Sequence, residues 1–154
     1  MRLTLSSVIT AGITASVVVV LFLMIIPKLI GLGTMDITHD IGLAFSAQSP
    51  HIAGALFLAL VGIIWAAIFS VLYNAIPGGY FVKGTIFGLV VGFFSLTVMP
   101  NLLVSLGGLI GSASQYAVTP FTMNIHTILT LIAYVVFGLT MAWTYRPTHT
   151  GSKA

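Results

Sequence analysis

The chain alternates long apolar runs with short polar segments, and four of the runs have the length of a membrane span. A helix of about 20 apolar residues crosses the roughly 30 Å hydrocarbon core of a bilayer, because each residue rises about 1.5 Å. The pattern therefore predicts an all-α, polytopic membrane protein with a single transmembrane domain over residues 1–154. The predicted helices are 6–26, 51–75, 83–106 and 124–145, and the outer segments are 28–50 and 107–123.

Prolines and glycines mark where the helices stop. The sequence Pro77-Gly78 is a turn signal that ends the second helix, and residues 107–120, rich in glycine and serine, separate the third from the fourth. Proline deletes one backbone hydrogen bond and restricts the residue before it. We therefore expect the first helix to end at Pro27 and the third to kink at Pro100 and continue beyond it.

The amino-acid composition also indicates a membrane protein. The chain is 58% hydrophobic and 5% charged, whereas a soluble domain is about 25% charged. Such a chain has too few charges to solvate a globular surface, which excludes soluble enzymes, nucleic-acid binders and disordered regulators. Cysteine is absent, so disulfides and thiolate metal sites are excluded. The spans also lack central charges and hydrolase motifs, so we expect neither an enzyme nor an ion pathway.

Charge placement predicts the orientation of the spans. Arg2, Lys83, Arg146 and Lys153 fall on one side of a four-span topology, while Lys28 and both aspartates fall on the other. Cytoplasmic loops carry the excess of Lys and Arg. We therefore expect both termini in the cytoplasm and, if the host is bacterial, an inner-membrane protein whose outer segments face the periplasm.

The two halves of the chain repeat one pattern of glycine, proline and histidine. The matched pairs are Gly12 and Gly84, Pro27 and Pro100, His51 and His126, and Gly62 and Gly138. Each half is a helical hairpin, and the first helices of the two hairpins point the same way. The pattern therefore predicts two parallel repeats that form a pseudo-twofold four-helix bundle, with its axis along the membrane normal.

Small residues recur at helical spacing in two of the spans. Gly84, Gly88 and Gly92 form two overlapping GxxxG units in the third span. A stripe of small residues in the second span consists of Ala55, Ala59, Gly62, Ala66 and Ser70. Small faces let helices approach closely in lipid. Each set has two interpretations, packing inside the bundle or docking to another subunit.

The outer segment 34–42 contains both acids of the chain. As a short interfacial helix capped by Thr34, it places Asp36, His39 and Asp40 on one face. Two carboxylates and an imidazole are acceptable ligands for Zn, Mn or Fe, so a metal site is one hypothesis. The other is a solvated polar face, because a closed site needs a fourth ligand.

His51 and His126 form the second candidate site. They open the second and fourth helices at matching places in the two repeats, so a twofold bundle can bring them toward one axis. Two such histidines can ligate a b-type haem or a chlorophyll-like pigment, and one can hydrogen-bond a quinone carbonyl. The alternative for each is a histidine at a helix start that bonds water or a carbonyl.

Several short motifs together resemble a family of small four-helix bacterial membrane proteins of uncharacterised function. The residues that carry the resemblance are Pro27, Met35-Asp36-Ile37, Gly42, His51, Tyr73, Pro77-Gly78, Gly84-Thr85-Ile86-Phe87-Gly88 and Met99-Pro100. The resemblance covers most of residues 8–145. It implies the fold and the topology, and it supplies no reaction.

Three functions fit these observations. The leading hypothesis is a non-catalytic accessory subunit of a larger membrane complex in bacterial respiratory or photosynthetic electron transport, with lipid and other integral membrane subunits as partners and no cofactor. The second is an electron carrier that binds haem or a quinone through His51 and His126. The third is a small transporter or lipid-binding protein for an uncharged substrate, which predicts a pocket between the two repeats.

Overall fold

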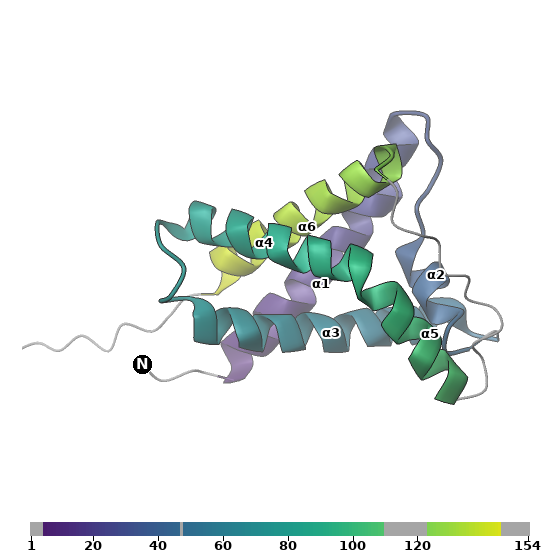
Figure 1. The fold of residues 1–154 in the computed structure, drawn as a ribbon, viewed down its shortest axis with the longest axis horizontal. Coiled ribbons are helices and arrows are strands. Elements are labelled where there is room, and N and C mark those ends of the chain that lie inside the picture. The colour runs from purple at the N-terminus through teal and green to yellow at the C-terminus, as the bar shows by residue number, and fades with distance from the viewer. Residues whose placement is uncertain (1–4, 47, 110–122, 146–154) are drawn as a thin grey trace, which may run out of the picture.

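Six helices make up the part of the chain that the computed structural model describes, residues 5–46, 48–109 and 123–145. They are α1 (Leu5–Leu29), α2 (Ile37–Gly42), α3 (Pro50–Leu72), α4 (Tyr80–Thr97), α5 (Met99–Leu109) and α6 (Ile125–Thr144) (Figure 1). Four of them, α1, α3, α4 and α6, are long and apolar enough to cross a membrane. The prediction of an all-helical chain with four spans is confirmed, and it indicates an integral membrane protein in contact with lipid.

The first, second and fourth predicted helices lie within a few residues of the observed spans α1, α3 and α6, and the third predicted helix does not match a single span. The predicted helix 83–106 is two helices in the structure, α4 and α5, and a short helix, α2, lies in the first outer segment. Most of the second outer segment, along with Arg2, Arg146 and Lys153, lies outside the described residues.

Pro27 shapes the end of α1 without stopping it. Because proline has no backbone N–H, the carbonyl of Leu23 one turn earlier loses its helical partner. This carbonyl accepts the N–H of Met35 instead, at 3.3 Å. The helix ends at Leu29, two residues after Pro27. Gly31 follows with a φ of 79°, which lets the N–H of Leu32 bond the Pro27 carbonyl at 2.9 Å. The predicted end at Pro27 is therefore two residues early, and the proline ties the following segment back to α1.

The kink expected at Pro100 is a break between two helices. The N–H of Val98 still bonds the carbonyl of Phe94 at 2.8 Å, but Pro100 has no N–H to continue the ladder. The chain resumes as α5, which bends away from the direction of α4 (Figure 1). With 18 residues, α4 is about 27 Å long, close to the thickness of the hydrocarbon core.

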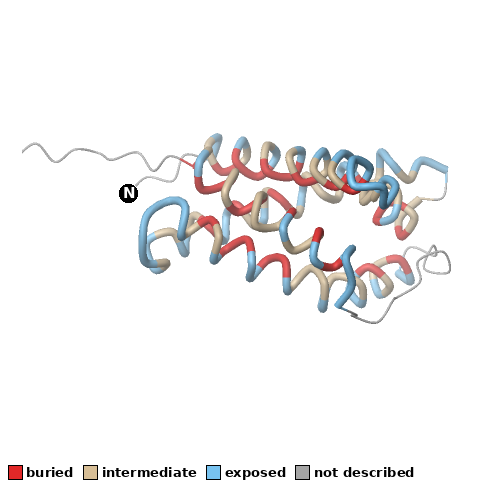
Figure 2. The backbone as a smooth tube through the Cα atoms, turned by 90° about the horizontal axis from the view of Figure 1, so that it is seen from above, coloured by how far each residue is buried: buried red, intermediate tan, exposed pale blue. Residues whose placement is uncertain are grey.

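The spans pack in the order α3, α1, α6, α4. The closely packed pairs are α1 with α3, α1 with α6, and α4 with α6, and α2 lies against α3. Successive spans run in opposite directions, so both predicted hairpins are present (Figure 1). Buried positions line the sides of the helices that face one another, and exposed positions face outward (Figure 2). We call the end that carries α2 the outer end and the opposite end the inner end.

Glycine brings α1 and α3 into backbone contact. A Cβ on Gly12 would lie 2.6 Å from the carbonyl oxygen of Gly62, which is closer than real Cβ atoms approach. One turn further along α1, Ser16 donates its hydroxyl to the carbonyl of Leu58 at 3.0 Å. The first hairpin is thus held by small residues and one interhelical hydrogen bond.

The glycine ridge Gly84, Gly88 and Gly92 makes the equivalent contact between α4 and α6. All three glycines are buried, and a Cβ on Gly84 would lie 2.8 Å from the carbonyl oxygen of Gly138. In turn, a Cβ on Gly138 would overlap the carbonyl oxygen of Gly84. In the structure this ridge therefore serves packing inside the bundle.

Aromatic side chains join α3 to α4, whose backbones are not a closely packed pair. Phe69 is fully buried, and its ring lies 4.9 Å from that of Phe87, while Trp65 meets Phe87 edge-on at 6.0 Å. At the inner end, Lys83 donates to the backbone carbonyl of Tyr73 and lies 4.1 Å over its ring. The two halves are thereby linked through packing and a cation–π contact.

The contact at Gly138 makes a stability prediction. Replacing Gly138→Ala inserts a methyl group against backbone atoms of α4 that cannot rotate away, so we expect a loss of about 1–3 kcal/mol and a fall of several degrees in the melting temperature in detergent. Gly79→Ala is the matched control, because a Cβ there meets nothing within 4 Å. Equal melting temperatures for the two variants would contradict the proposed contact.

Candidate functional site

Asp36 caps the short helix α2 and is the centre of a polar cluster at the outer end. Its Oδ1 accepts the N–H of His39 at 3.1 Å and the hydroxyl of Thr38 at 2.6 Å. The prediction that Thr34 caps this helix is wrong. Asp36 directly precedes the first helical residue, Ile37, and occupies the cap position instead. Asp36 is therefore a capping residue and does not lie on the helix face with His39 and Asp40.

Backbone contacts fix α2 against the outer end of α3. A Cβ on Gly42 would overlap the carbonyl of Pro50, and a Cβ on Gly54 would overlap the carbonyl of Thr38. The hydrogen bond from Met35 to α1 holds the residue just before Asp36. The position of the Asp36 carboxylate is thus set by glycine contacts on one side and by α1 on the other.

His51, in the first turn of α3, completes the cluster. Its Nδ1 lies 3.4 Å from Oδ2 of Asp36 and 3.4 Å from Oγ1 of Thr38, and its ring centre lies 5.2 Å from that of His39. The structure therefore joins two groups that sequence reasoning kept apart, the acids of the outer segment and the histidine of the second span. The close approach of Gly54 to α2, which brings them together, has no signal in the sequence beyond the glycine itself.

His126 lies apart from this cluster. It is exposed in the first turn of α6, where Asn124 caps the helix by accepting the N–H of Thr127 at 2.9 Å. The helices that carry His51 and His126 are not a closely packed pair, because α1 lies between them in the packing order. The contacts of the His51 ring described above all come from the first outer segment.

The described side chains do not gather into a metal site. Among residues 5–46, 48–109 and 123–145, no group of three or more His, Asp or Glu side chains could hold a metal ion. Asp40 lies 3.6 Å from Nδ1 of His39, and its side chain is 70% exposed. The predicted set of Asp36, His39 and Asp40 is therefore split between a cap and an exposed surface.

The surroundings of Asp36 favour its charged form. The hydrogen bond from Thr38 lowers the pKa of this carboxyl most, and the backbone N–H of His39 and the nearby rings of His51 and His39 lower it further. Partial burial opposes these effects, since desolvation raises the pKa, but the net direction is down. Asp36 is thus a stable negative charge at the outer end.

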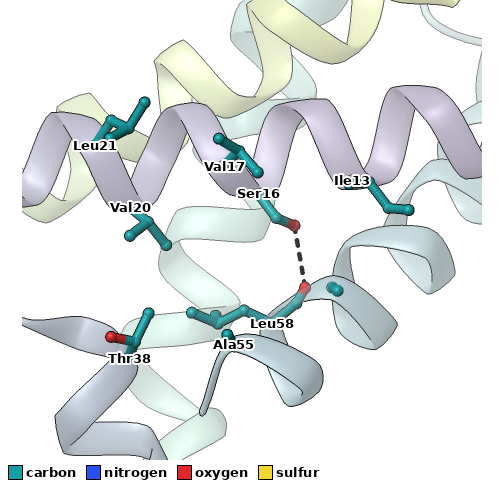
Figure 3. A pocket seen from close by; sticks show the side chains of 9 residues that line it. Ile13, Ser16, Val17, Val20, Leu21, Thr38, Ala55 and Leu58 are labelled. Carbon is teal, nitrogen blue, oxygen red and sulfur yellow. Dashed lines mark hydrogen bonds between the residues drawn. The ribbon is translucent and has the colours of Figure 1, made fainter. Parts of the chain in front are cut away.

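A groove of about 170 Å³ lies between α1 and α3 and reaches this cluster. Its walls are almost entirely apolar. In Figure 3, Ile13 lies at one end of the groove, and Leu21, Val20 and Thr38 lie toward the other. Ala55 and Ala59 form the floor on α3, so two of the five residues of the predicted stripe face this groove. Thr38 connects the groove to the carboxylate of Asp36 through its hydroxyl.

Seven of the nine serine and threonine hydroxyls in α3 to α6 are used by their own helices. The other two are Thr127, whose hydroxyl donates to the side chain of Asn124, and Ser95, whose buried oxygen has no hydrogen-bond partner among the described residues. Each of the seven donates to a backbone carbonyl three or four residues earlier, which satisfies it without a partner on another helix. These residues are Ser70, Thr85, Thr97, Ser105, Thr130, Thr140 and Thr144. They do not form a polar path between helices.

No family model, curated protein or solved structure matches the chain. Functional reasoning therefore rests on the geometry of the bundle, the polar cluster and the groove.

The cap at Asp36 predicts a pH dependence. Because the folded-state pKa is lowered, the charged carboxylate stabilises the fold above the ordinary aspartate pKa of about 3.9 and loses this effect as the pH falls through the folded-state pKa. We expect Asp36→Asn to melt a few degrees below the wild type at pH 7, and the gap between the two melting temperatures to close as the pH falls below about 3.9 and through the folded-state pKa.

Asp40→Asn is the control for this measurement, since the Asp40 side chain is largely exposed. Its melting temperature should follow the wild-type curve at every pH. A constant gap between wild type and Asp36→Asn from pH 7 to pH 3 would show that the charge of Asp36 is not the stabilising element.

Proposed function

We propose that the protein is a non-catalytic accessory subunit of a larger membrane complex. Two observations support this. Seven of the nine serine and threonine hydroxyls in α3 to α6 are satisfied inside their own helices, so few polar groups in these spans are free to assemble a site. One span, α3, is also much less covered than the others by the part of the chain that the structure describes.

The exposure of α3 is the observation that carries the proposal. Only 17% of its apolar stretch is buried, against 33%, 28% and 39% for α1, α4 and α6. The exposed side chains form one row at a spacing of four residues, which is one face of a helix. This α3 ridge consists of Ile52, Leu56, Leu60, Ile64 and Ile68.

Docking through the α3 ridge fits the physics of helix association in lipid. Helices associate there by close packing, and a straight row of branched side chains fits between the ridges of another helix. The glycine ridge of α4, the other candidate for docking, is already occupied by α6. We therefore assign the interface with other subunits to α3.

We further propose that the complex belongs to bacterial respiratory or photosynthetic electron transport, in the inner membrane and with both termini in the cytoplasm. The sequence supports this orientation, because Arg2, Lys83, Arg146 and Lys153 fall on one side of the four-span topology and only Lys28 falls on the other. The identity of the subunits that accompany the protein tests the assignment to electron transport.

The internal duplication is part of the same proposal. In each hairpin a glycine of the first helix meets a glycine of the second, Gly12 with Gly62 and Gly84 with Gly138. These are the glycines that the repeat pattern pairs between the halves. A pseudo-twofold relation of the hairpins is supported by these equivalent contacts, and the bacterial four-helix family suggested by the sequence motifs remains compatible with it.

The alternative functions have less support in the geometry. A carrier that uses His51 and His126 together needs both rings at one cofactor, whereas α1 separates the helices that bear them. A transporter is expected to hold its substrate between the two repeats. The groove described above lies within the first hairpin, between α1 and α3.

Extraction of the tagged protein from its native membrane in mild detergent, followed by mass spectrometry, tests the proposal. We expect stoichiometric co-purification of other integral membrane subunits, and electron-transport subunits among them. Ile64→Trp on the α3 ridge should lower their yield at least fivefold, because the larger ring prevents close packing.

Ile25→Trp is the matched control, since Ile25 on α1 is 50% exposed and Ile64 is 51% exposed. It should leave the yield unchanged. Recovery of the wild-type protein alone, or an equal loss in both variants, would overturn docking through α3.

A further inference from the structure

The groove between α1 and α3 opens toward the hydrocarbon of the bilayer. Ile13, Val17 and Leu21 form its rim on α1 and are 41%, 51% and 49% exposed. These positions lie four residues apart, so the rim follows the axis of the helix over about 12 Å. The α3 ridge uses other residues, and the groove is therefore a separate surface.

The size of the groove decides what can enter it. An α-helix with its side chains is about 10 Å across, which is far too wide for a volume of about 170 Å³. An apolar cavity of about 150 Å³ holds a single benzene molecule, so this groove suits a segment of one hydrocarbon chain. Its apolar walls and its opening toward lipid favour the same occupant.

The outer mouth of the groove is negatively charged. Thr38 lines the groove and donates to Asp36, and Asp40 lies one turn further along α2. These are the only two acids of the chain, against five Lys and Arg, so its negative charge is concentrated at this point. His39 lies 3.6 Å from the carboxylate of Asp40, and His51 lies 3.4 Å from that of Asp36.

We propose that the groove binds one acyl chain of an outer-leaflet phospholipid whose headgroup ends in a primary ammonium group. The chain lies against Ala55 and Ala59, and the ammonium group lies over the carboxylates of Asp36 and Asp40. Charge complementarity favours this headgroup over an anionic one, because a phosphoglycerol headgroup brings no cation to the carboxylates. The inference goes beyond the accessory role and does not depend on it.

Native mass spectrometry of lipid retention tests the proposal. The full-length protein is reconstituted in vesicles of phosphatidylethanolamine and phosphatidylglycerol in equal amounts with identical acyl chains, and is then extracted at pH 8 in mild detergent. We expect one retained lipid per protein and at least a fivefold excess of phosphatidylethanolamine over phosphatidylglycerol.

Two sets of variants separate the groove from the headgroup site. Ala55→Phe fills the groove and should lower total lipid retention at least fivefold, and Ala59→Leu does the same with a smaller side chain if the first variant fails to fold. Ala67→Phe, an exposed position on α3 outside the groove, should retain lipid as the wild type does. Asp36→Asn combined with Asp40→Asn should keep the lipid and reduce the excess to about one.

Equal retention of the two lipids by the wild type would overturn the headgroup assignment, and lipid retention unchanged in both Ala55→Phe and Ala59→Leu would overturn the groove. A quinone recovered in place of phospholipid after extraction from native membranes would also overturn the proposal. If Ile64→Trp loses partner subunits but retains lipid as the wild type does, the result bears on the accessory role and leaves the lipid proposal unchanged. The two proposals can therefore be overturned independently.

Discussion

Close contact between helix backbones is the interaction on which this bundle depends. Helices surrounded by lipid gain little from burying apolar surface against each other, so their association requires van der Waals contact at short range. Gly12 with Gly62 and Gly84 with Gly138 provide that contact, once in each hairpin. Larger residues at these positions would separate the two helices of each hairpin.

Pro27 connects this fold to the polar cluster. Its missing N–H frees the carbonyl of Leu23, and this carbonyl takes the N–H of Met35. The next residue, Asp36, is thereby placed where it caps α2 and reaches His51. In a bilayer an unpaired carbonyl is costly, so the hydrogen bond that Pro27 deletes is replaced by one that orders the outer segment.

The spans could be predicted from the sequence because many residues contribute to each apolar run, and no single residue decides it. The cap of α2 could not be predicted from the sequence, because Thr34 and Asp36 are both good capping residues. Tertiary contacts at Met35 and Gly54 decide between them. The predicted pairing of His51 with His126 rested on the repeat alone. The helices that carry the two residues, α3 and α6, are not a closely packed pair, and their approach to one cofactor stays a prediction.

The stripe of small residues on α3 shows how one sequence feature serves two structural roles. At Gly62 and Ala66 the stripe is buried, and Gly62 lies in the contact with α1. Toward the outer end α1 and α3 diverge, and α2 lies against α3 there (Figure 1). Because Gly54 admits α2 to close contact with α3, the space between the crossing point and α2 stays open, and Ala55 and Ala59 form the floor of the groove. The groove is therefore a consequence of inserting a capped helix between two diverging spans, and the Asp36 cap lies at its mouth for the same reason.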